Sequence, residues 1–159
     1  MAKVFLLFGS NIGDRQGYIN DAIVSVSKEI GTISKQSSIF ETSAWGNTAQ
    51  QSFYNSVAIV ESTLPPELLL NVILRIEKEL GRVRINKWEA RSIDIDILYY
   101  DDWIFESENL MIPHPLLHQR RFTLVPLVEI APNHIHPKLQ LSNSQLLDAS
   151  IDTLDVIKV

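Results

Sequence analysis

The 159-residue chain contains no cysteine. This absence excludes disulfide scaffolds, thiol nucleophiles and cysteine-ligated zinc together. The sequence also lacks any apolar run near the roughly 20 residues that a membrane-spanning helix needs, and its first residues carry too short an apolar run for a secretory signal. We therefore expect a soluble, cytoplasmic protein with no membrane partner.

The sequence also has no excess of positively charged residues. The 14 Lys and Arg residues are outnumbered by 19 Asp and Glu residues, which gives a formal net charge of −5 and argues against a nucleic-acid partner. The charges are unevenly distributed, because residues 75–91 hold six of the 14 cations whereas residues 92–119 hold six acids and no Lys or Arg. A basic segment that leads directly into an acidic one suits an anionic ligand bridged by a metal ion.

The composition is sufficient for one folded domain, since 45% of the residues are hydrophobic and 21% are charged. No repeat, linker or low-complexity segment divides the chain. We therefore expect a single domain over residues 1–159, acting as a monomer.

Hydrophobic periodicity predicts an α+β chain with the element order βαββαβ. The predicted elements are strands at 4–10, 33–40, 55–62 and 92–100 and helices at 19–30 and 66–80. This order is typical of the ferredoxin-like fold, in which helices cover one face of an antiparallel sheet. Gly31 is expected to end the first helix in the left-handed conformation, and Gly81 closes the second helix.

Further elements follow this core. A turn at residues 101–102 leads into an expected short strand at 103–105, and a helix is expected over 123–130, beginning near Arg121. A terminal element is expected from Ser144 onward, so the core carries C-terminal additions. The polar connection 41–52 is long for a hairpin, which is typical of a functional or mobile loop.

Asp94 and Asp96 are two positions apart on a predicted strand, so both carboxylates project from one face, about 6.6 to 7 Å apart along the backbone. Paired oxygen ligands suit magnesium that is also bound by substrate phosphates. The alternative is a solvated strand face. Arg91 and the basic segment 81–88 favour the phosphate site, because guanidinium groups neutralise phosphate oxygens. His114, between two prolines, could donate to a phosphate.

The segment 9–14 is glycine-rich, but it lacks the Lys-Ser/Thr ending of a P-loop, and we interpret it as mainly a structural turn. Several aromatic residues lie outside the periodic apolar stripes, and at least two of them should line a site for a flat heterocycle. These aromatic residues are Trp45, Phe53, Tyr54, Trp88 and Phe122.

Taken together, these motifs resemble one family over nearly the whole chain. The segments that carry the resemblance are Gly9-Ser10-Asn11, 42–46, Phe53-Tyr54-Asn55, 77–84, Trp88, 91–98, Pro113-His114 and 120–132. They are similar to the 6-hydroxymethyl-7,8-dihydropterin pyrophosphokinases of folate biosynthesis. The most specific part is Arg-x-x-Asp-x-Asp-Ile-Leu joined to an upstream Gly-Arg-x-Arg.

The resemblance implies an ATP-dependent diphosphotransferase. It would move the β,γ-diphosphate of ATP to the hydroxymethyl oxygen of the pterin and release AMP. Asp94 and Asp96 would bind two magnesium ions, and Arg82 and Arg91 would stabilise the moving diphosphate. No residue stands out as a general base, and positioning with electrostatics is expected to suffice.

The resemblance also implies two binding sites. The positions that match the ATP site are Glu77, Arg82, Arg84, Trp88, Arg91, Ile97, His114 and Arg120. The positions that match the pterin site are Thr42, Ala44, Trp45, Phe53, Asn55, Trp88 and Phe122. Phe53 and Phe122 are the expected stacking plates, and Asn55 is expected to read the polar edge of the ring.

Two non-catalytic classes share the expected fold. A ferredoxin-like RNA-binding module would carry aromatics on its central strands and a basic sheet, whereas this chain places Asp94 and Asp96 on a strand. A small-ligand regulatory domain has no need for paired aspartates beside arginines. The residues therefore favour an enzyme over an RNA-binding module or a regulatory domain.

Overall fold

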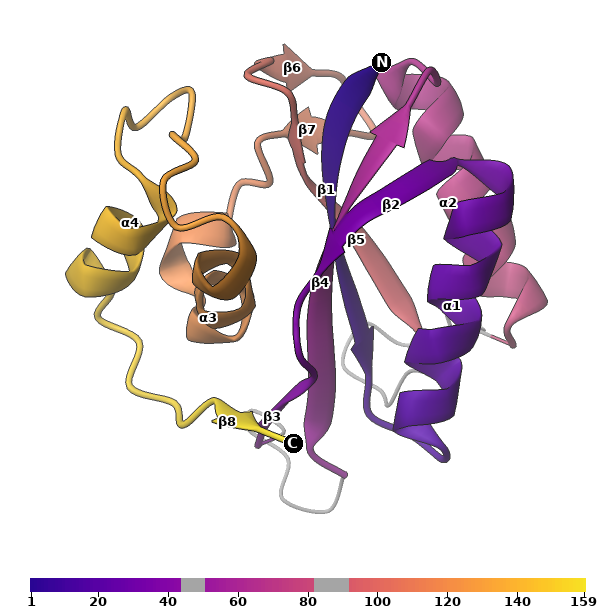
Figure 1. Cartoon of the computed structure of the whole chain (residues 1–159), viewed down its shortest axis with the longest axis horizontal. Helices are drawn as coiled ribbons and strands as arrows, with labels where there is room; N and C mark the ends of the chain where they lie inside the picture. Colours follow the sequence, from indigo (N-terminus) through magenta and orange to yellow (C-terminus); the bar gives the residue numbers. More distant parts are fainter. Residues whose placement is uncertain (44–50, 82–91) are drawn as a thin grey trace.

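The computed structural model describes residues 1–43, 51–81 and 92–159 and shows an antiparallel sheet with helices on both sides (Figure 1). The elements are β1 (Ala2–Ser10), α1 (Arg15–Glu29), β2 (Gly31–Gln36), β3 (Phe40–Thr42), β4 (Phe53–Ser62), α2 (Pro66–Glu79), β5 (Asp94–Tyr100), β6 (Phe105–Glu106), β7 (Met111–Ile112), η1 (Leu117–Gln119), α3 (Arg121–Ile130), α4 (Asn143–Ala149) and β8 (Ile157–Lys158). Within these described ranges, no helix is long and apolar enough to cross a membrane.

The main sheet has the strand order β5-β1-β4-β3-β8, and β2 also pairs with β4. All of these pairings are antiparallel. The central strands β1 and β4 follow the split arrangement expected of a ferredoxin-like chain, in which β4 separates β1 from the strands that follow α1. The predicted α+β class and the βαββαβ order are therefore confirmed.

The predicted strand 33–40 is wrong as a continuous element, because it is divided into β2 and β3. The register with β4 shifts between Ile33 and Lys35. Ser37 then interrupts the ladder, since its hydroxyl oxygen accepts from the Val57 N–H at 2.9 Å, where a backbone carbonyl would otherwise bind. The chain rejoins β4 at Phe40 and continues to Thr42, inside the segment predicted as a connection.

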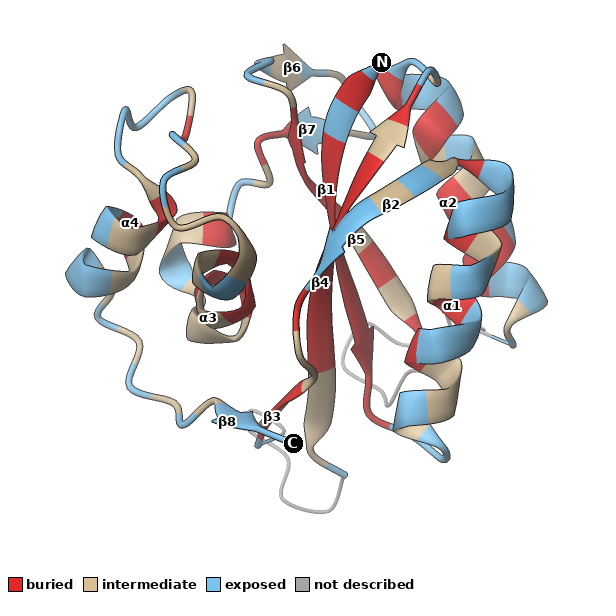
Figure 2. Ribbon diagram, in the orientation of Figure 1, coloured by how far each residue is buried: buried red, intermediate tan, exposed pale blue. Residues whose placement is uncertain are grey.

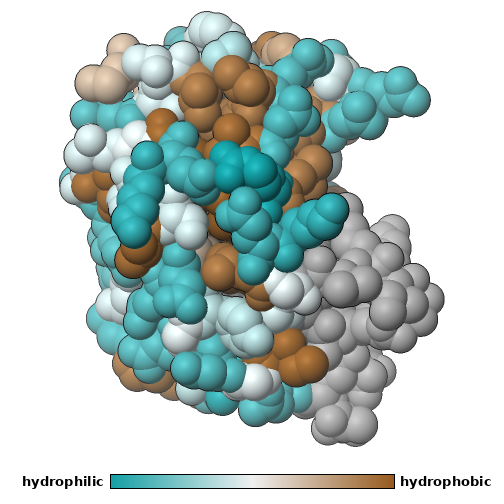
Figure 3. All heavy atoms as spheres, turned by 90° about the vertical axis from the view of Figure 1, so that its right-hand side faces the viewer, coloured by the Kyte–Doolittle hydropathy of each residue, from teal (hydrophilic) through white to brown (hydrophobic). Residues whose placement is uncertain are grey.

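Helices α1 and α2 cover one face of the sheet and bury its main apolar core (Figure 2). Asp14 caps α1 as its side chain accepts from the Gly17 N–H at 3.0 Å. Gly81 follows α2 with φ +91°, the left-handed region that favours glycine. The sides of α1 and α2 that face away from the sheet form a mainly hydrophilic surface with smaller apolar areas (Figure 3).

Gly31 has a different role from the predicted left-handed helix end. It is the first residue of β2, and Ile30 ends α1 in the right-handed region. A Cβ at Gly31 would collide with the carbonyl oxygen of Glu61 on β4. Glycine is therefore required by the close approach of two strands rather than by its freedom at positive φ.

The second face of the sheet is covered at one end by α3 and α4, which are the C-terminal additions (Figure 1). Leu124 and Leu127 of α3 pack in a second apolar cluster with Phe5 and Leu7 of β1. The helix predicted over 123–130 is confirmed with its start at Arg121. The strand expected at 103–105 is shorter than predicted: β6 begins at Phe105 and pairs with β7.

Candidate active site

The candidate site lies on the face of the sheet that α3 and α4 cover. It begins at the first row of paired residues across β5, β1 and β4 that lies beyond α3. In that row Asp94 lies opposite Gly9, and Gly9 lies opposite Asn55 on β4. In the preceding row Asp96 lies opposite Leu7, which belongs to the apolar cluster under α3. Because side chains alternate along a strand, both aspartates and Asn55 project from this same face.

Gly9 leaves space for the side chain of Asn55. A Cβ at Gly9 would lie 2.8 Å from the Asn55 amide nitrogen. That nitrogen donates to the Phe8 carbonyl oxygen at 3.3 Å, so the amide lies across β1. Asn55 is only 4% exposed, and its side chain thus has a defined orientation above β1.

Two buried oxygen atoms in this region lack a hydrogen-bond partner among the described residues: Thr42 Oγ1 and Asn55 Oδ1. Buried polar atoms in native proteins are almost always hydrogen-bonded, and each exception calls for an explanation. Thr42 lies opposite Phe53, which is half-buried at the start of β4. Two polar atoms beside an aromatic ring suit a flat ligand with polar edges.

Asp94 and Asp96 are both half-buried. Across the described parts of the chain there is no group of three or more His, Asp or Glu side chains that could bind a metal ion. Magnesium differs from zinc in needing only one or two protein carboxylates, with water and substrate phosphates completing its shell. The paired carboxylates therefore fit magnesium and do not form a closed, all-protein metal site.

Glu77 connects α2 to the strand that carries both aspartates. It is 3% exposed, and its Oε2 accepts from the Ile95 N–H at 2.8 Å, between Asp94 and Asp96. The structure thus shows Glu77 supporting β5, and its predicted contact with ATP stays a prediction.

His114 lies between β5 and α3. The backbone N–H of His114 donates to the Leu98 carbonyl oxygen at 3.0 Å. The ring Nδ1 accepts from the Leu116 backbone N–H at 3.1 Å. Burial, and then the positive charge of Arg120, lower the pKa of His114 to about 4, although Asp94 opposes the shift. The ring is therefore neutral near pH 7, and with Nδ1 as an acceptor its proton is on Nε2.

Arg120 and Phe122 flank the first residue of α3. The guanidinium carbon of Arg120 lies 5.4 Å from the centre of the Phe122 ring, within cation–π range. Helix α3 also contacts β3 and β4, which carry Thr42 and Phe53. The start of α3 thus combines a predicted ATP residue with a predicted stacking residue.

Ile97 is buried in the core between the sheet and the two N-terminal helices. Its side chain cannot reach a ligand there, so a contact with ATP would use its main chain. Six other predicted site residues lie outside the described residues. They are Ala44, Trp45, Arg82, Arg84, Trp88 and Arg91.

Arg15, in the first turn of α1, was not among the predicted site residues. Its Nη1 donates to Ser52 Oγ at 2.8 Å and to the Ser52 carbonyl oxygen at 3.0 Å, and it lies 3.5 Å from Glu41 Oε2. Its guanidinium carbon lies 3.9 Å from the centre of the Tyr54 ring. Arg15 therefore joins the residue before Thr42 to the residue before Phe53. A lone arginine after a helix cap gave no signal of this role.

The segment 9–14 was interpreted as mainly a structural turn after a strand predicted at 4–10. Gly9 and Ser10 are the last two residues of β1, in agreement with that strand, and residues 11–14 connect it to α1. Ser10 is fully buried, and its hydroxyl has no partner within the described part of the chain. Buried polar residues at the end of a strand could have indicated a site.

The fold and the site together define a ferredoxin-like α+β protein whose sheet carries a candidate metal and ligand site. Residues 5–132 match the family model of the 7,8-dihydro-6-hydroxymethylpterin-pyrophosphokinases (HPPK). The chain belongs to this family. It is therefore an enzyme, an ATP-dependent diphosphotransferase of folate biosynthesis, and the two non-catalytic alternatives are not supported.

Named relatives agree with this membership. The chain is 46% identical over 137 residues to the 2-amino-4-hydroxy-6-hydroxymethyldihydropteridine pyrophosphokinase of Aquifex aeolicus, covering 86% of this chain and 85% of that protein. It is 41% identical over 143 residues to the folic acid synthesis protein FOL1 of Dictyostelium discoideum, covering 90% of this chain but only 22% of that protein. The second relative is thus much longer than the chain.

A solved structure supports the fold. The HPPK-DHPS of Plasmodium falciparum with pteroate aligns with a TM-score of 0.76 at 16% sequence identity. The alignment covers 92% of this chain and 42% of that chain. The likeness extends beyond the sheet to the helices on both of its faces.

Proposed function

We propose that the described residues divide the work of diphosphate transfer between a phosphate side on β5 and a pterin side on β3, β4 and α3. In the family reaction the hydroxymethyl oxygen of 6-hydroxymethyl-7,8-dihydropterin bonds to the β-phosphorus of ATP. The bond between that phosphorus and the α-phosphate oxygen breaks, AMP leaves, and the hydroxyl proton passes to solvent. Residues 1–159 would form one pyrophosphokinase domain, which acts as a monomer in the cytoplasm.

On the phosphate side, Asp94 and Asp96 bind two magnesium ions, which supply positive charge to the oxygens of the triphosphate. His114 donates its Nε2 proton to a phosphate oxygen, and Arg120 adds a permanent positive charge beside it. Glu77 supports the backbone between the aspartates and thus fixes their direction. Arg82 and Arg91 stabilise the moving diphosphate.

On the pterin side, Asn55 and Thr42 bind the polar edge of the ring. Their oxygen atoms, which have no hydrogen-bond partner among residues 1–43, 51–81 and 92–159, suit the amino and ring N–H donors of a pterin. Phe53 and Phe122 stack on its faces, because aromatic side chains bind planar rings through offset stacking. Ala44, Trp45 and Trp88 complete this side, and Arg84, Trp88 and the main chain of Ile97 bind the nucleotide.

The observation that carries this proposal is the row in which Asp94, Gly9 and Asn55 lie directly opposite one another. Neighbouring strands are about 4.8 Å apart, so two strand spacings separate the acidic residue from the amide. Between the two backbones this leaves about 10 Å, which is room for a planar ring that carries a hydroxymethyl group. The row thus supports a site at which the pterin and the triphosphate meet.

An AMP-release assay tests the function directly. The full chain is incubated with ATP and magnesium, with and without 6-hydroxymethyl-7,8-dihydropterin, and AMP and the pterin diphosphate are quantified. We expect the two products in equal amounts and only when the pterin is present. Release of ADP, or AMP formation independent of the pterin, would refute the proposed reaction.

A further inference from the structure

The last ten residues of the chain, 150–159, form a segment that contacts both α3 and β3, the two elements that carry Phe122 and Thr42 of the proposed pterin site. We call it the C-terminal segment. It leaves α4, passes α3 and ends at β3, as the yellow trace in Figure 1 shows. It lies beyond residue 132, where the match to the family model ends.

The first contact is with the start of α3. Asp152 Oδ2 accepts from the Arg121 N–H at 2.9 Å, and the Arg121 side chain donates from Nε to the Leu154 carbonyl oxygen at 3.1 Å. A carboxylate that accepts from the first N–H groups of a helix fixes the position of its first turn. That turn contains Phe122 and directly follows Arg120.

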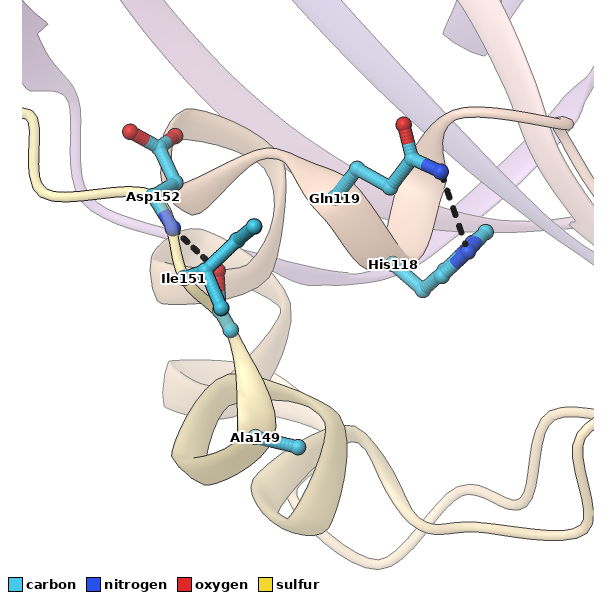
Figure 4. Close-up of a pocket in the computed structure, with 6 residues that line it drawn as sticks. His118, Gln119, Ala149, Ile151 and Asp152 are labelled. Atoms are coloured by element: carbon cyan, nitrogen blue, oxygen red, sulfur yellow. Dashed lines mark hydrogen bonds between the residues drawn. The ribbon is translucent and has the colours of Figure 1, made fainter.

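Asp152 itself is fixed by the local backbone. Its N–H donates to Ser150 Oγ at 3.2 Å, and its Oδ1 accepts from the Leu154 N–H at 3.0 Å. Figure 4 shows Asp152 beside an open hollow of about 480 Å³, lined by His118, Gln119, Ala149, Ser150, Ile151 and Asp152. Within the structure the Asp152 carboxylate binds the start of α3.

The second contact is with β3. Strand β8 pairs with Phe40 and Glu41, and the Val159 N–H donates to the Ile39 carbonyl oxygen at 2.9 Å. Strand β3 is only three residues long and ends at Thr42. It therefore depends on its two neighbours, β4 and β8, for its position.

A third set of contacts connects α3 with β8 and with the start of β3. Lys158 Nζ lies 3.2 Å from Glu129 Oε2 near the end of α3, and the other carboxylate oxygen of Glu129 accepts from the Ser38 N–H just before β3. The C-terminal segment thus contacts both ends of α3, and it pairs with the first two residues of β3.

We propose that Asp152 and β8 are positioning elements of the pterin site: Asp152 fixes the turn that carries Phe122, and β8 fixes the strand that carries Thr42. This inference rests on the proposed pterin site. Neither element touches a substrate. They set the distance between α3 and β3. Small displacements of binding groups have large effects on rate and affinity.

The test compares point variants of the full chain. Ile157→Pro removes a ladder donor, because alternation from Val159 directs the Ile157 N–H toward β3. Ile157→Thr is the matched control, since it keeps that N–H and a β-branched side chain. We expect Ile157→Pro to raise the KM for the pterin about threefold to tenfold while the KM for ATP stays within twofold of the wild-type value, and Ile157→Thr to behave like the wild type.

Asp152 provides a second, independent pair of variants. Asp152→Ala removes the acceptor at the start of α3 and is expected to raise the KM for both substrates, because the turn follows Arg120 and contains Phe122. Asp152→Asn keeps an acceptor oxygen and is expected to restore most of the loss. Thermal unfolding of each variant shows that the fold is intact.

Calorimetric titration of 6-hydroxymethyl-7,8-dihydropterin in the presence of a non-hydrolysable ATP analogue and magnesium gives a readout without turnover. A higher Kd for Ile157→Pro than for Ile157→Thr supports the proposal. Folded Ile157→Pro and Asp152→Ala proteins with wild-type pterin KM and Kd would overturn it. The AMP assay on the wild-type chain separates this outcome from a failure of the proposed function.

Discussion

Gly9 is the position at which a single added carbon atom would disturb the site most directly. The Asn55 amide occupies the space above its Cα, and Asn55 is the residue expected to read the pterin edge. Gly9 lies in a regular strand without a positive φ, so alanine is compatible with its backbone. The conflict is therefore confined to the side chain of Asn55, which is proposed to bind the pterin.

We expect Gly9→Ala to raise the Kd for the pterin about tenfold with the ATP affinity unchanged, because the new Cβ displaces the Asn55 amide. A double-mutant cycle with Asn55→Ala checks the cause. In the Asn55→Ala background, Gly9→Ala should have almost no further effect. Additive losses in the two variants would show that Gly9 acts through another group.

The carboxylates of Asp94 and Asp96 are expected to be essential for turnover. Asp94→Asn and Asp96→Asn should each lower kcat/KM about a thousandfold, which corresponds to about 4 kcal/mol of transition-state stabilisation. Asp102→Asn is the matched control, because Asp102 lies in the exposed turn after β5. A folded Asp94→Asn or Asp96→Asn protein with near wild-type activity at saturating magnesium would refute the metal assignment.

Among the elements, β3 and the start of β4 are connected by Arg15 of α1 as well as by their own ladder. Arg15 binds Ser52 and Glu41 and stacks on Tyr54. These contacts lie one residue away from Thr42 and Phe53. The helix on one side of the sheet thus influences the proposed ligand site on the other.

Replacing Arg15 should therefore affect one substrate selectively. We expect Arg15→Ala to raise the KM for the pterin about threefold to tenfold, to leave the KM for ATP unchanged, and to lower the free energy of unfolding by about 1 kcal/mol. Arg15→Lys keeps the charge without the planar fork and should give an intermediate KM. Steady-state kinetics with each substrate varied in turn provide the measurement. Equal changes in both KM values would contradict a role confined to β3 and β4.

The elements also show what periodicity can predict. Strands β1, β4 and β5 and helices α1 and α2 were predicted because each has a regular apolar pattern. The division of β2 from β3 was not predicted, since it depends on a hydroxyl of Ser37 that replaces a backbone acceptor from a distant strand. The role of Gly31 was misassigned for the same reason, because it is set by contact with Glu61.

Some residues of the candidate site could likewise be predicted from the sequence, and others could not. The aspartate pair could be predicted from strand alternation alone, and the family resemblance supplied the pterin and ATP residues. Arg15 and the contact of Asp152 with Arg121 could not be predicted, because they depend on partners 26 or more residues away in the sequence and on side-chain direction. Local sequence patterns do not contain such distances.

On the scale of the whole molecule, stability should depend on pH through His136. This residue lies between α3 and α4 and is 4% exposed. Burial, with smaller contributions from His118 and Lys138, lowers the pKa of His136 to about 4. An unfolded chain binds the proton near the ordinary value of about 6.5. As pH falls from about 6.5 to about 4, protonation therefore favours the unfolded state, and no such penalty exists above that window.

We expect His136 to account for a loss of about 2 kcal/mol in the free energy of unfolding between pH 7 and pH 5. His136→Asn provides the comparison, because an asparagine side chain can still accept from the Lys138 N–H, which His136 Nδ1 now binds at 3.2 Å. Urea unfolding of both proteins at the two pH values measures the difference. Other histidines are unchanged in the variant, so parallel pH dependences would contradict the assignment to His136.

Glu77 has a consequence for self-association. Strand β5 is at one end of the strand order formed by the described residues, so its outer main-chain groups have no neighbouring strand there. The Glu77 carboxylate accepts from one of them, the Ile95 N–H, and α2 lies beside it. An uncovered edge of this kind is a template for pairing with another chain. The same carboxylate that supports the aspartates thus also occupies a donor that a second strand would need in order to pair with β5.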